Sequence, residues 1–228
     1  LRYMTQAGGK LSPELHREFA EYAKNTGKKF IVMYGQTEAT ARMAYLPSEK
    51  SLEKYGSMGI AIPHGKLWLK DVDGNQIKEA DIVGELVYEG ANVTLGYAEC
   101  LADLAKEDER HGVLKTGDMA KMDADGYFYI VGRKKRFLKI YGNRVNLDEV
   151  ERMIKQEFEQ IECACAGVDD HLYVFTTTDQ EEIQTQIRQL LAGKTGLNPK
   201  AYIVKYIEEI PKNDAGKTLY RKLEKYYD

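Results

Sequence analysis

The chain has few cysteines: three in 228 residues, two of them only two positions apart at Cys163 and Cys165. Three cysteines do not make a disulfide framework, and a structural zinc site needs four ligands, for which the sequence offers no matching set. If the segment "IECACAGV" is a strand, both thiols point to the same face. We therefore interpret them as core thiols, and the cysteine usage as typical of a reducing, cytoplasmic compartment.

Long apolar runs and an excess of one charge are also lacking. No stretch approaches the roughly 20 apolar residues that span a bilayer, and no signal peptide precedes the first residue. The 33 Lys and Arg and 36 Asp and Glu are interleaved and give a net charge of −3, so no basic field recruits nucleic acid. We expect no nucleic-acid partner and no membrane span. The chain opens in mid-pattern without methionine, and we expect a piece of a longer protein.

What is present begins with a strand, a helix and a second strand in residues 1–34. "LRYMTQAGG" predicts a short strand closed by glycines, and "FIVMY" predicts another. Between them, Ser12 can cap a helix, Pro13 fits its first position and Gly27 can end it in a left-handed conformation. Leu15, Phe19 and Tyr22 fall on one stripe of this helix. One such unit cannot make a stable sheet, so we expect the rest of the sheet upstream.

The remaining chain changes texture twice. Short alternating strands and turns, such as "GKLWLKD" and "GELVYEG", predict a β-rich region. After "GRKKR" the pattern is mixed: a strand or hairpin at "FLKIYGNRV", helices at about 147–159 and 180–192, and strands near 161–168 and 171–177. The fold class predicted is α/β and α+β, in three parts: a remnant of a large α/β subdomain at 1–54, a small β-rich subdomain at 55–132 and a mobile mixed α+β domain at 133–228.

The segment "YGQTE" follows an apolar strand directly, where open α/β sheets bind ligands. Tyr34 offers an aromatic face for a planar base, and Gly35 lets backbone approach a ligand. Thr37 can donate to a phosphate oxygen, and Glu38 can help to hold Mg²⁺ beside it. These residue types are also common in loops, so an ordinary turn stays open as the alternative.

Two further motifs carry charged side chains. In "LKTGD", Asp118 can accept hydrogen bonds from both ribose hydroxyls of a nucleotide, and Arg133 adds a fork of donors; a turn-forming aspartate is the alternative. By composition, the basic run from Arg133 to Arg136 is a solvated surface or linker. In "IPKNDAGK", Lys217 lies on a glycine-containing loop, as would a mobile ammonium that stabilises developing negative charge, although surface lysines are the commoner case.

The order of these motifs is more specific than any one of them. "AGGKLS", "YGQTEA", "GELVYEGANVTLGY", "LKTGD", "DGYFYIVGRKKRFLKIYGNRVNLDEVE" and "IPKNDAGK" resemble, in sequence and spacing, the later half of the adenylate-forming acyl-CoA synthetases. This superfamily includes peptide-synthetase adenylation domains and firefly luciferase. The resemblance covers essentially the whole chain and implies a luciferase-like fold that binds ATP or AMP and Mg²⁺.

The resemblance also implies roles for individual residues. Lys217 would bridge the acyl carboxylate and the α-phosphate during adenylation, and Lys135 would lie at the hinge between the large and small domains. In the second half-reaction, "LKIYGNRV" would face the active site, with Lys139 in a catalytic position. The nucleotide and phosphate positions implied are Gly8, Gly9, Tyr34, Gly35, Thr37, Asp118, Ile130, Arg133 and Arg144, with Glu38 as the metal position. Gly142 would leave room for a pantetheine arm in the second half-reaction.

The implied reaction joins a small carboxylic acid, with a fatty acid favoured, to the thiol of coenzyme A through an acyl-AMP intermediate. The family's upstream phosphate loop and most of its acyl pocket have no counterpart here, so we expect the 228-residue chain alone to be inactive. Two alternatives stay open. The thiol acceptor is the phosphopantetheine arm of an acyl carrier protein, or the chain is a non-catalytic nucleotide-binding or interaction module.

Overall fold

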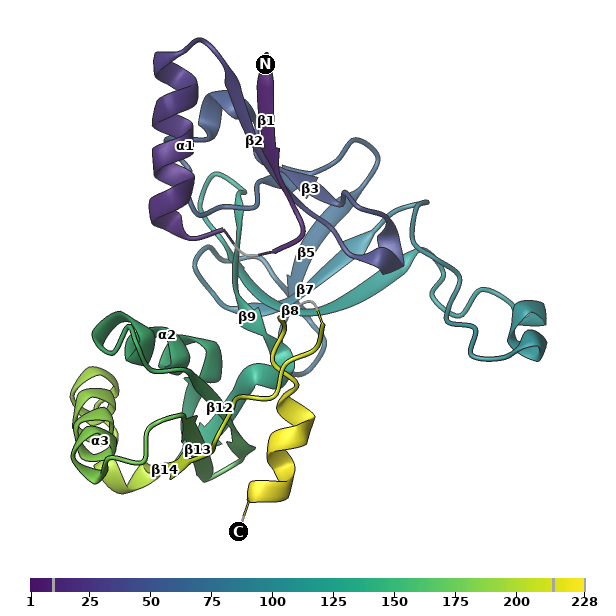
Figure 1. Ribbon diagram of the computed structural model, residues 1–228. Coiled ribbons are helices and arrows are strands. Elements are labelled where there is room, and N and C mark those ends of the chain that lie inside the picture. Colours follow the sequence, from purple (N-terminus) through teal and green to yellow (C-terminus); the bar gives the residue numbers. More distant parts are fainter. Residues whose placement is uncertain (10, 215, 228) are drawn as a thin grey trace. The chain divides into compact units, whose positions relative to one another are not determined.

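The computed structural model describes residues 1–9, 11–214 and 216–227 (Figure 1). The chain divides into two compact units, which we call unit 1 (Leu1–Lys134) and unit 2 (Lys135–Asp228) and describe separately. Both combine sheets with few helices, so the predicted mixed α/β and α+β character is confirmed. The finer division at residue 54 and the mobility of the C-terminal part stay predictions.

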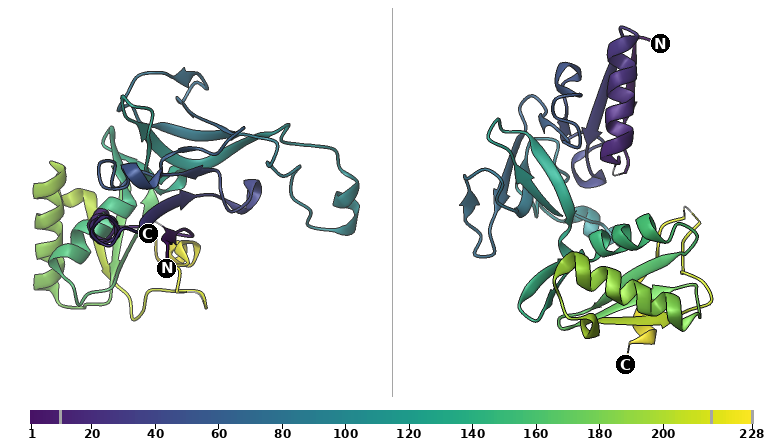
Figure 2. Two further views of the ribbon diagram at one scale, coloured as in Figure 1. Left: turned by 90° about the horizontal axis from the view of Figure 1, so that it is seen from above. Right: turned by 90° about the vertical axis from the view of Figure 1, so that its left-hand side faces the viewer.

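Unit 1 begins with the strand–helix–strand arrangement that the sequence predicts. Strand β1 (Tyr3–Gln6) pairs in parallel with β2 (Lys29–Tyr34), and helix α1 (Pro13–Asn25) connects them. Figures 1 and 2 show α1 lying alongside these two strands. Two short antiparallel strands, β3 (Ala44–Tyr45) and β4 (Ile60–Ala61), complete a sheet in the order β1-β2-β3-β4.

The ends of α1 are set by the residues that the sequence suggests. The Ser12 side chain accepts a hydrogen bond from the main-chain nitrogen of Leu15 at 3.2 Å, Pro13 occupies the first turn, and Gly27 just after the helix has a φ of 64°. The stripe of Leu15, Phe19 and Tyr22, however, is 41–48% exposed. The side chains one position further along, His16, Ala20 and Ala23, are the buried ones.

His16 fastens α1 to the segment that follows β3. Its Nδ1 accepts a hydrogen bond from the main-chain nitrogen of Gly56 at 2.9 Å, and its Nε2 lies 3.2 Å from the Ser51 hydroxyl. Burial lowers the pKa of His16, so the imidazole is neutral at physiological pH. Because Nδ1 is the acceptor, Nε2 carries the proton and donates to Ser51.

The second sheet of unit 1 is antiparallel and carries most of the unit's core. Its strand order is β6-β5-β7-β8-β9, and apolar side chains such as Leu69, Leu86 and Ala120 alternate inward. Between β7 and β8, the segment 95–112 extends away from the sheet in Figure 1. The strands are β5 (Lys66–Lys70), β6 (Gln76–Ile77), β7 (Gly84–Glu89), β8 (Val113–Met122) and β9 (Phe128–Arg133).

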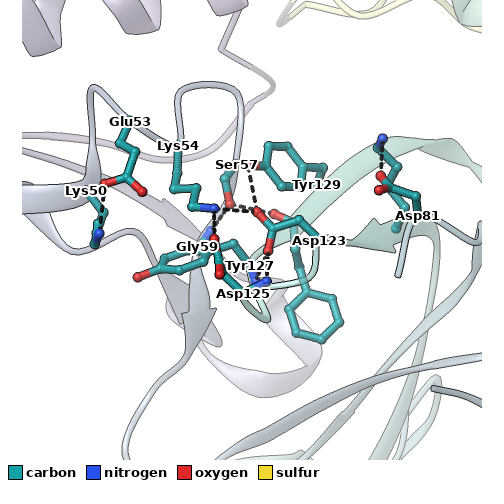
Figure 3. Close-up of polar contacts among 12 residues, drawn as sticks. Lys50, Glu53, Lys54, Ser57, Gly59, Asp81, Asp123, Asp125, Tyr127 and Tyr129 are labelled. Atoms are coloured by element: carbon teal, nitrogen blue, oxygen red, sulfur yellow. Dashed lines mark hydrogen bonds and ion pairs between the residues drawn. The ribbon is translucent and has the colours of Figure 1, made fainter. Parts of the chain in front are cut away.

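A lysine pins the segment after β3 to the turn between β8 and β9 (Figure 3). The Lys54 ammonium lies 3.0 Å from Asp123 Oδ2 and also pairs with Asp125. Asp123 Oδ1 accepts hydrogen bonds from the main-chain nitrogens of Asp125 and Tyr127, which shapes the turn, and the Tyr129 hydroxyl donates to Asp123 Oδ2 at 3.2 Å. These contacts fix the start of β9, the strand that ends at Arg133.

Unit 2 is a three-stranded sheet with helices on one face. Strand β12 pairs antiparallel with β13, which pairs in parallel with β14. Helices α2 and α3 cover one face, and a 3-10 helix (Tyr220–Tyr226) covers the other (Figures 1 and 2). The remaining elements are β10 (Phe137–Ile140), β11 (Asn143–Asn146), α2 (Leu147–Glu157), β12 (Cys163–Val168), β13 (His171–Thr176), α3 (Glu181–Thr195) and β14 (Tyr202–Tyr206).

The cysteine pair lies where the sequence places it. Cys163 and Cys165 point from β12 into the core beneath α2 and α3, and both are free thiols. Burial raises the pKa of Cys163 to about 12 and raises that of Cys165 as well, so both are inert thiols at neutral pH. The prediction of core thiols is confirmed. In the described part of the chain, no helix has the length and apolar character needed to cross a membrane.

Candidate functional site

A buried carboxylate is the centre of the candidate site in unit 1. Asp118 in β8 is only 4% exposed. Its Oδ2 accepts hydrogen bonds from the Tyr34 hydroxyl at 2.5 Å and the Gln36 amide at 2.9 Å, and its Oδ1 lies 2.9 Å from Arg133 Nε. The structure thus brings together three predicted residues, Tyr34, Asp118 and Arg133, from segments that are far apart in the sequence.

Local geometry explains why Asp118 points into this cluster. Asp118 pairs with Arg133 across β8 and β9, and the register of these strands shifts immediately afterwards, at Met119 and Ala120. Thr116 fixes the main chain just before Asp118. Its hydroxyl donates to the main-chain oxygen of Leu86 at 2.8 Å and accepts from the Asp118 nitrogen at 3.1 Å. Irregular antiparallel pairing of this kind re-aims a side chain.

The hydrogen bonds of Asp118 limit how it can hold a ligand. A carboxylate has about four acceptor positions, and Tyr34, Gln36 and Arg133 use three of them. One position on Oδ1 is open to a hydroxyl group. A ligand with two adjacent hydroxyls therefore needs one partner to move, and the Arg133 side chain, 60% exposed, is the easiest to displace.

Tyr34 is held in its neutral, donating form. Burial raises the pKa of its phenol, and the charge of Asp118 raises it further, because an ionised phenolate would face a carboxylate. Gln36 supports the pair by donating to the main-chain oxygen of Thr116 at 3.0 Å as well as to Asp118. The sequence analysis did not identify Gln36 as a site residue, although it lies inside the "YGQTE" motif.

A glycine is needed at position 35 because the main chain of the same turn passes close to it. A Cβ atom on Gly35 would lie 2.3 Å from the main-chain oxygen of Ala41, so no larger residue fits without movement of the backbone. This close approach is internal to the turn, and an approach to a ligand stays a prediction. The turn continues as a short 3-10 helix, Thr37–Ala39, in which the Thr37 side chain is exposed.

Glu38, the predicted metal position, accepts a hydrogen bond that the motif did not reveal. The Tyr97 hydroxyl donates to Glu38 Oε1, and the Arg110 guanidinium lies 4.6 Å from the centre of the Tyr97 ring. The hydrogen bond from Tyr97 lowers the pKa of Glu38, which is therefore anionic at neutral pH. Among the described residues, no group of three or more acidic, His or Cys side chains is placed to hold a metal ion. A single carboxylate fits Mg²⁺ that takes its other ligands from phosphates and water.

Three further predicted nucleotide positions, Gly8, Gly9 and Ile130, are in unit 1 as well. Gly8, with a φ of 90°, and Gly9 follow β1, and the Gln6 amide donates to the main-chain oxygen of Gly9 at 2.7 Å. Ile130 in β9 is partly buried against the core beneath β8. Their roles toward a nucleotide stay predictions.

In unit 2, one hairpin carries the predicted thiol-side residues Lys139 and Gly142 and the predicted phosphate position Arg144. Lys139 in β10 lies opposite Arg144 in β11, and Tyr141 and Gly142 form the turn, both with positive φ. The Arg144 guanidinium lies 4.4 Å from the centre of the Phe137 ring, and the main-chain nitrogen of Lys139 donates to Asp169 at 2.8 Å. The hairpin presents the exposed Lys139 and Arg144 side chains on a firmly bonded backbone.

From its composition we expected the basic run from Arg133 to Arg136 to be solvated. The structure shows that its members differ in burial. Lys134 pairs with the buried carboxylate of Glu85 at 2.9 Å, within unit 1. Arg136 is 9% exposed and pairs with Asp148 and Glu151 of α2, within unit 2. The expectation of a solvated run is wrong for Arg136, because α2 supplies two carboxylates that compensate its burial.

Lys217 is an exposed residue of unit 2 whose main chain is hydrogen-bonded to Asn213. Its main-chain nitrogen donates to Asn213 Oδ1 at 2.9 Å, and its oxygen accepts from the Asn213 nitrogen at 2.9 Å. The Leu219 nitrogen donates to the Pro211 oxygen at 2.7 Å and closes the loop. The side chain is exposed, as a lysine that reaches a ligand must be.

Comparisons with known proteins identify the family of this chain. The family model described as "AMP-binding enzyme" matches residues 1–98. The long-chain-fatty-acid–CoA ligase of Yersinia pestis is 34% identical over 209 residues, which cover 87% of this chain and 36% of the relative. The chain therefore spans less than half the length of this relative.

Two solved structures share the fold. The O-succinylbenzoate coenzyme A synthetase of Bacillus subtilis, solved with ATP and a magnesium ion, aligns with a TM-score of 0.70 at 21% identity and covers 98% of this chain and 46% of its own. The McyG A-PCP protein, solved with phenylalanyl-adenylate, aligns with a TM-score of 0.68 at 23% identity and covers 100% and 44%. At these identities the likeness shows the fold alone. With the family-model match and the relatives, it confirms the resemblance found in the sequence: the chain belongs to the adenylate-forming superfamily of AMP-binding enzymes.

Proposed function

We propose that the protein to which this chain belongs is an acyl-CoA synthetase that activates a carboxylic acid with Mg-ATP as acyl-AMP and transfers the acyl group to the thiol of coenzyme A. The observation that carries the proposal is the buried Asp118 carboxylate, which Tyr34, Gln36 and Arg133 hold in the motif positions of an adenylate-forming enzyme. An exposed turn aspartate would not need three buried or charged partners.

Unit 1 would bind the nucleotide. The Asp118 carboxylate would accept a ribose hydroxyl at its open position, and Arg133 would move from Asp118 toward ribose or phosphate oxygens. The ring of Tyr34, with Gly8, Gly9 and Ile130, would line the adenine. Thr37 would donate to a phosphate oxygen, and anionic Glu38 would help to hold Mg²⁺, which neutralises charge on the leaving pyrophosphate.

Unit 2 would supply the groups that differ between the two half-reactions. The Lys217 ammonium would stabilise charge between the acyl carboxylate and the α-phosphate during adenylation. The hairpin with Lys139 and Gly142 would face the active site in the second half-reaction, where a glycine leaves room for a pantetheine arm. Arg144 on the same hairpin would contact phosphate. The change between the two arrangements requires a hinge, which we assign to Lys135.

The identity of acid and acceptor is a finer proposal. We favour a fatty acid, because the relative at 34% identity is a long-chain-fatty-acid–CoA ligase. The alternative acceptor is the phosphopantetheine arm of an acyl carrier protein, and the McyG A-PCP likeness keeps it open. An assay of thioester formation by the purified wild-type protein would separate the two. The protein is supplied with free coenzyme A or with a carrier protein that bears a free phosphopantetheine thiol, and thioester formation on only one of these acceptors decides the class. A chain that binds AMP but forms no acyl-adenylate would be the non-catalytic module.

Nucleotide affinity tests the central observation. In the whole protein, Asp118→Ala should weaken AMP binding by roughly 1.5 to 3 kcal/mol, a tenfold to hundredfold rise in dissociation constant, because a charge-assisted hydrogen bond is lost. Asp125→Ala, an exposed carboxylate seven residues on, is the matched control. Calorimetry with AMP, 2'-deoxy-AMP and 3'-deoxy-AMP should show that the wild type discriminates against at least one deoxy nucleotide and that the Asp118 variant does not. Equal discrimination by both proteins would overturn the assignment.

Proteolysis tests the hinge. If Lys135 is the point of rotation in the whole protein, limited digestion with trypsin should change around residues 133–137 when ATP is added. A cleavage pattern that is the same with and without ATP, together with unchanged small-angle scattering, would refute the hinge without touching the nucleotide assignment.

A further inference from the structure

A buried charged cluster lies immediately after Lys135, entirely within unit 2. The Arg136 guanidinium donates from Nε to Asp148 Oδ1, from Nη2 to Glu151 Oε1 and from Nη1 to the main-chain oxygen of Cys165, each at 2.6 Å. The charge of Glu151 and the hydrogen bond to Asp148 outweigh the effect of burial and raise the pKa of Arg136. Each of its three nitrogens thus donates one hydrogen bond within unit 2.

Tyr220 closes this cluster from the other end of the unit. The centre of its ring lies 3.8 Å from Arg136 Cζ, and its hydroxyl donates to Glu151 Oε2 at 3.2 Å. Glu151 Oε1 also accepts from the Cys165 nitrogen at 2.7 Å, so the carboxylate is bonded on both oxygens. Burial raises the pKa of Tyr220, followed by the charge of Glu151, and the phenol stays a donor at neutral pH.

Tyr220 is also the continuation of the Lys217 loop. Lys217 is three residues before Tyr220, and an extended chain of three residues spans only about 10 Å. The Asn213 contacts hold the loop at Lys217, and the bond from Leu219 to Pro211 closes its base directly before Tyr220. A displacement of Tyr220 is therefore expected to disturb the bond from Leu219 to Pro211 and, through it, the main chain that carries Lys217.

We propose that Arg136, Glu151 and Tyr220 form a clamp that positions Lys217 for adenylation by tying its loop to the chain that follows Lys135. The clamp residues are positioning residues, and the inference rests on the proposed function of Lys217. Displacement of a charge-stabilising group by about 1 Å is enough to cost on the order of a hundredfold in rate. The reaction class itself does not depend on the clamp.

Two variants of Tyr220 separate the contacts of the clamp. Tyr220→Phe keeps the ring against Arg136 and removes only the 3.2 Å hydrogen bond, whereas Tyr220→Leu removes both contacts. In the whole protein, we expect Tyr220→Leu to lower the kcat of carboxylate-dependent ATP–pyrophosphate exchange by about 10- to 100-fold, with the KM for ATP within about threefold of wild type. Tyr220→Phe should lower it by a smaller factor, about two- to fivefold, because only the hydrogen bond to Glu151 is lost.

The second half-reaction and a neighbouring tyrosine are the controls. Thioester formation from supplied acyl-adenylate and coenzyme A should stay within about threefold of wild type in both Tyr220 variants. Tyr227→Leu removes a ring stacked on Tyr173 at 4.7 Å and loosens the same C-terminal segment without touching the clamp. It should lower the thermal unfolding temperature but leave exchange unchanged. The acid is whichever of octanoate, palmitate and 4-coumarate supports exchange in the wild type.

The outcomes distinguish failure of the clamp from failure of the function. Equal loss in both half-reactions, an equal effect of Tyr227→Leu, or wild-type exchange in Tyr220→Leu would overturn the clamp. Lys217→Ala is measured in parallel, with Lys222→Ala as a surface-lysine control. If Lys217→Ala leaves exchange unchanged, or if no acid supports exchange in the wild type, the proposed function fails. If Tyr220→Leu does not fold, the result with Tyr220→Phe decides: a loss confined to adenylation supports the clamp, and no selective loss refutes it.

Discussion

Replacement of Tyr34 by phenylalanine tests the hydrogen bond at the centre of the candidate site. The Tyr34 hydroxyl donates to a carboxylate, Asp118, that is almost fully buried. Hydrogen bonds to charged groups contribute about 1.5 to 3 kcal/mol, and neutral ones about 0.5 to 1.5 kcal/mol. We expect Tyr34→Phe to lower the free energy of unfolding of unit 1 at neutral pH by the larger amount. Tyr88→Phe, which removes a bond of 2.8 Å to the neutral amide of Asn92, should cost the smaller amount.

The pH dependence of the free energy of unfolding is a second, independent test of the Tyr34 bond. Because the pKa of Tyr34 is raised in the folded chain, its stabilising effect is complete below the unfolded pKa of about 10 and is lost as the pH rises toward the folded pKa. At about pH 11 the unfolded phenol is mostly ionised while the folded one is protonated, which removes about 1.4 kcal/mol from the wild type. The gap between wild type and Tyr34→Phe should shrink by that amount, because the other tyrosines titrate alike in both proteins.

Fluorescence of the single tryptophan reports on the relevant unit. Trp68 lies in β5 of unit 1, and unit 2 has no tryptophan. Urea unfolding followed by this signal gives the free energy of unfolding of unit 1 at each pH. If Tyr34→Phe costs no more than Tyr88→Phe, or if the gap is the same at about pH 7 and about pH 11, Tyr34 is not a protonated donor to Asp118.

Three other variants or probes test separate parts of the structure. Gly35→Ala should lower the stability of unit 1 by about 1 to 3 kcal/mol by Trp68 fluorescence, because its Cβ would lie 2.3 Å from a main-chain oxygen. Glu151→Ala should lower the stability of unit 2 by about 3 kcal/mol, because it leaves the buried Arg136 without its main partner; circular dichroism should show an earlier transition while the Trp68 midpoint is unchanged. With a thiol reagent under native conditions, only the exposed Cys100 should react quickly, and denaturant should release the other two thiols.

Each of these has a matched comparison within the chain. Gly126→Ala places a Cβ in open space and should report only the cost of a positive φ. Glu149→Ala removes an exposed ion pair with Arg152 and should cost less than about 1 kcal/mol. Fast modification of all three thiols in the native protein would contradict the buried positions of Cys163 and Cys165, and equal effects of Glu149→Ala and Glu151→Ala would contradict the clamp's buried charge.

The parts of the fold that local chemistry dictates were predictable from the sequence. The ends of α1 follow from Ser12, Pro13 and Gly27, and the alternation around Cys163 gives β12. The face of α1 was harder. Leu15, Phe19 and Tyr22 form the more apolar stripe, but the small side chains on the neighbouring stripe let the helix approach β2. The pattern of apolar residues does not reveal how closely a helix approaches a strand. Strand β14 was missed although Tyr202 and Val204 alternate into the core.

The candidate site divides in the same way. Asp118 and Arg133 were found because their charged side chains suit ribose and phosphate oxygens. Gln36 lies in a motif as well but was missed, because its contact with Asp118 depends on how two sheets of unit 1 meet. Tyr97 reaches Glu38 from a long excursion between β7 and β8, which no local pattern anticipates. The burial of Arg136 was not predicted, because composition assigns the same environment to every residue of a basic run. In the folded chain, Lys134 and Arg136 have different partners.

The different partners of that run give the hinge proposal its physical content. Lys134 is held to Glu85 in unit 1, and Arg136 is held to Glu151 in unit 2. Among the described residues, the Lys135 side chain between them makes no hydrogen bond or ion pair. A rotation at this point can therefore use the backbone dihedrals of Lys135 while Lys134 and Arg136 keep their partners. A rotation centred on Arg136 would instead disturb its buried ion pair with Glu151, and loss of one partner of such a pair costs about 3 to 5 kcal/mol.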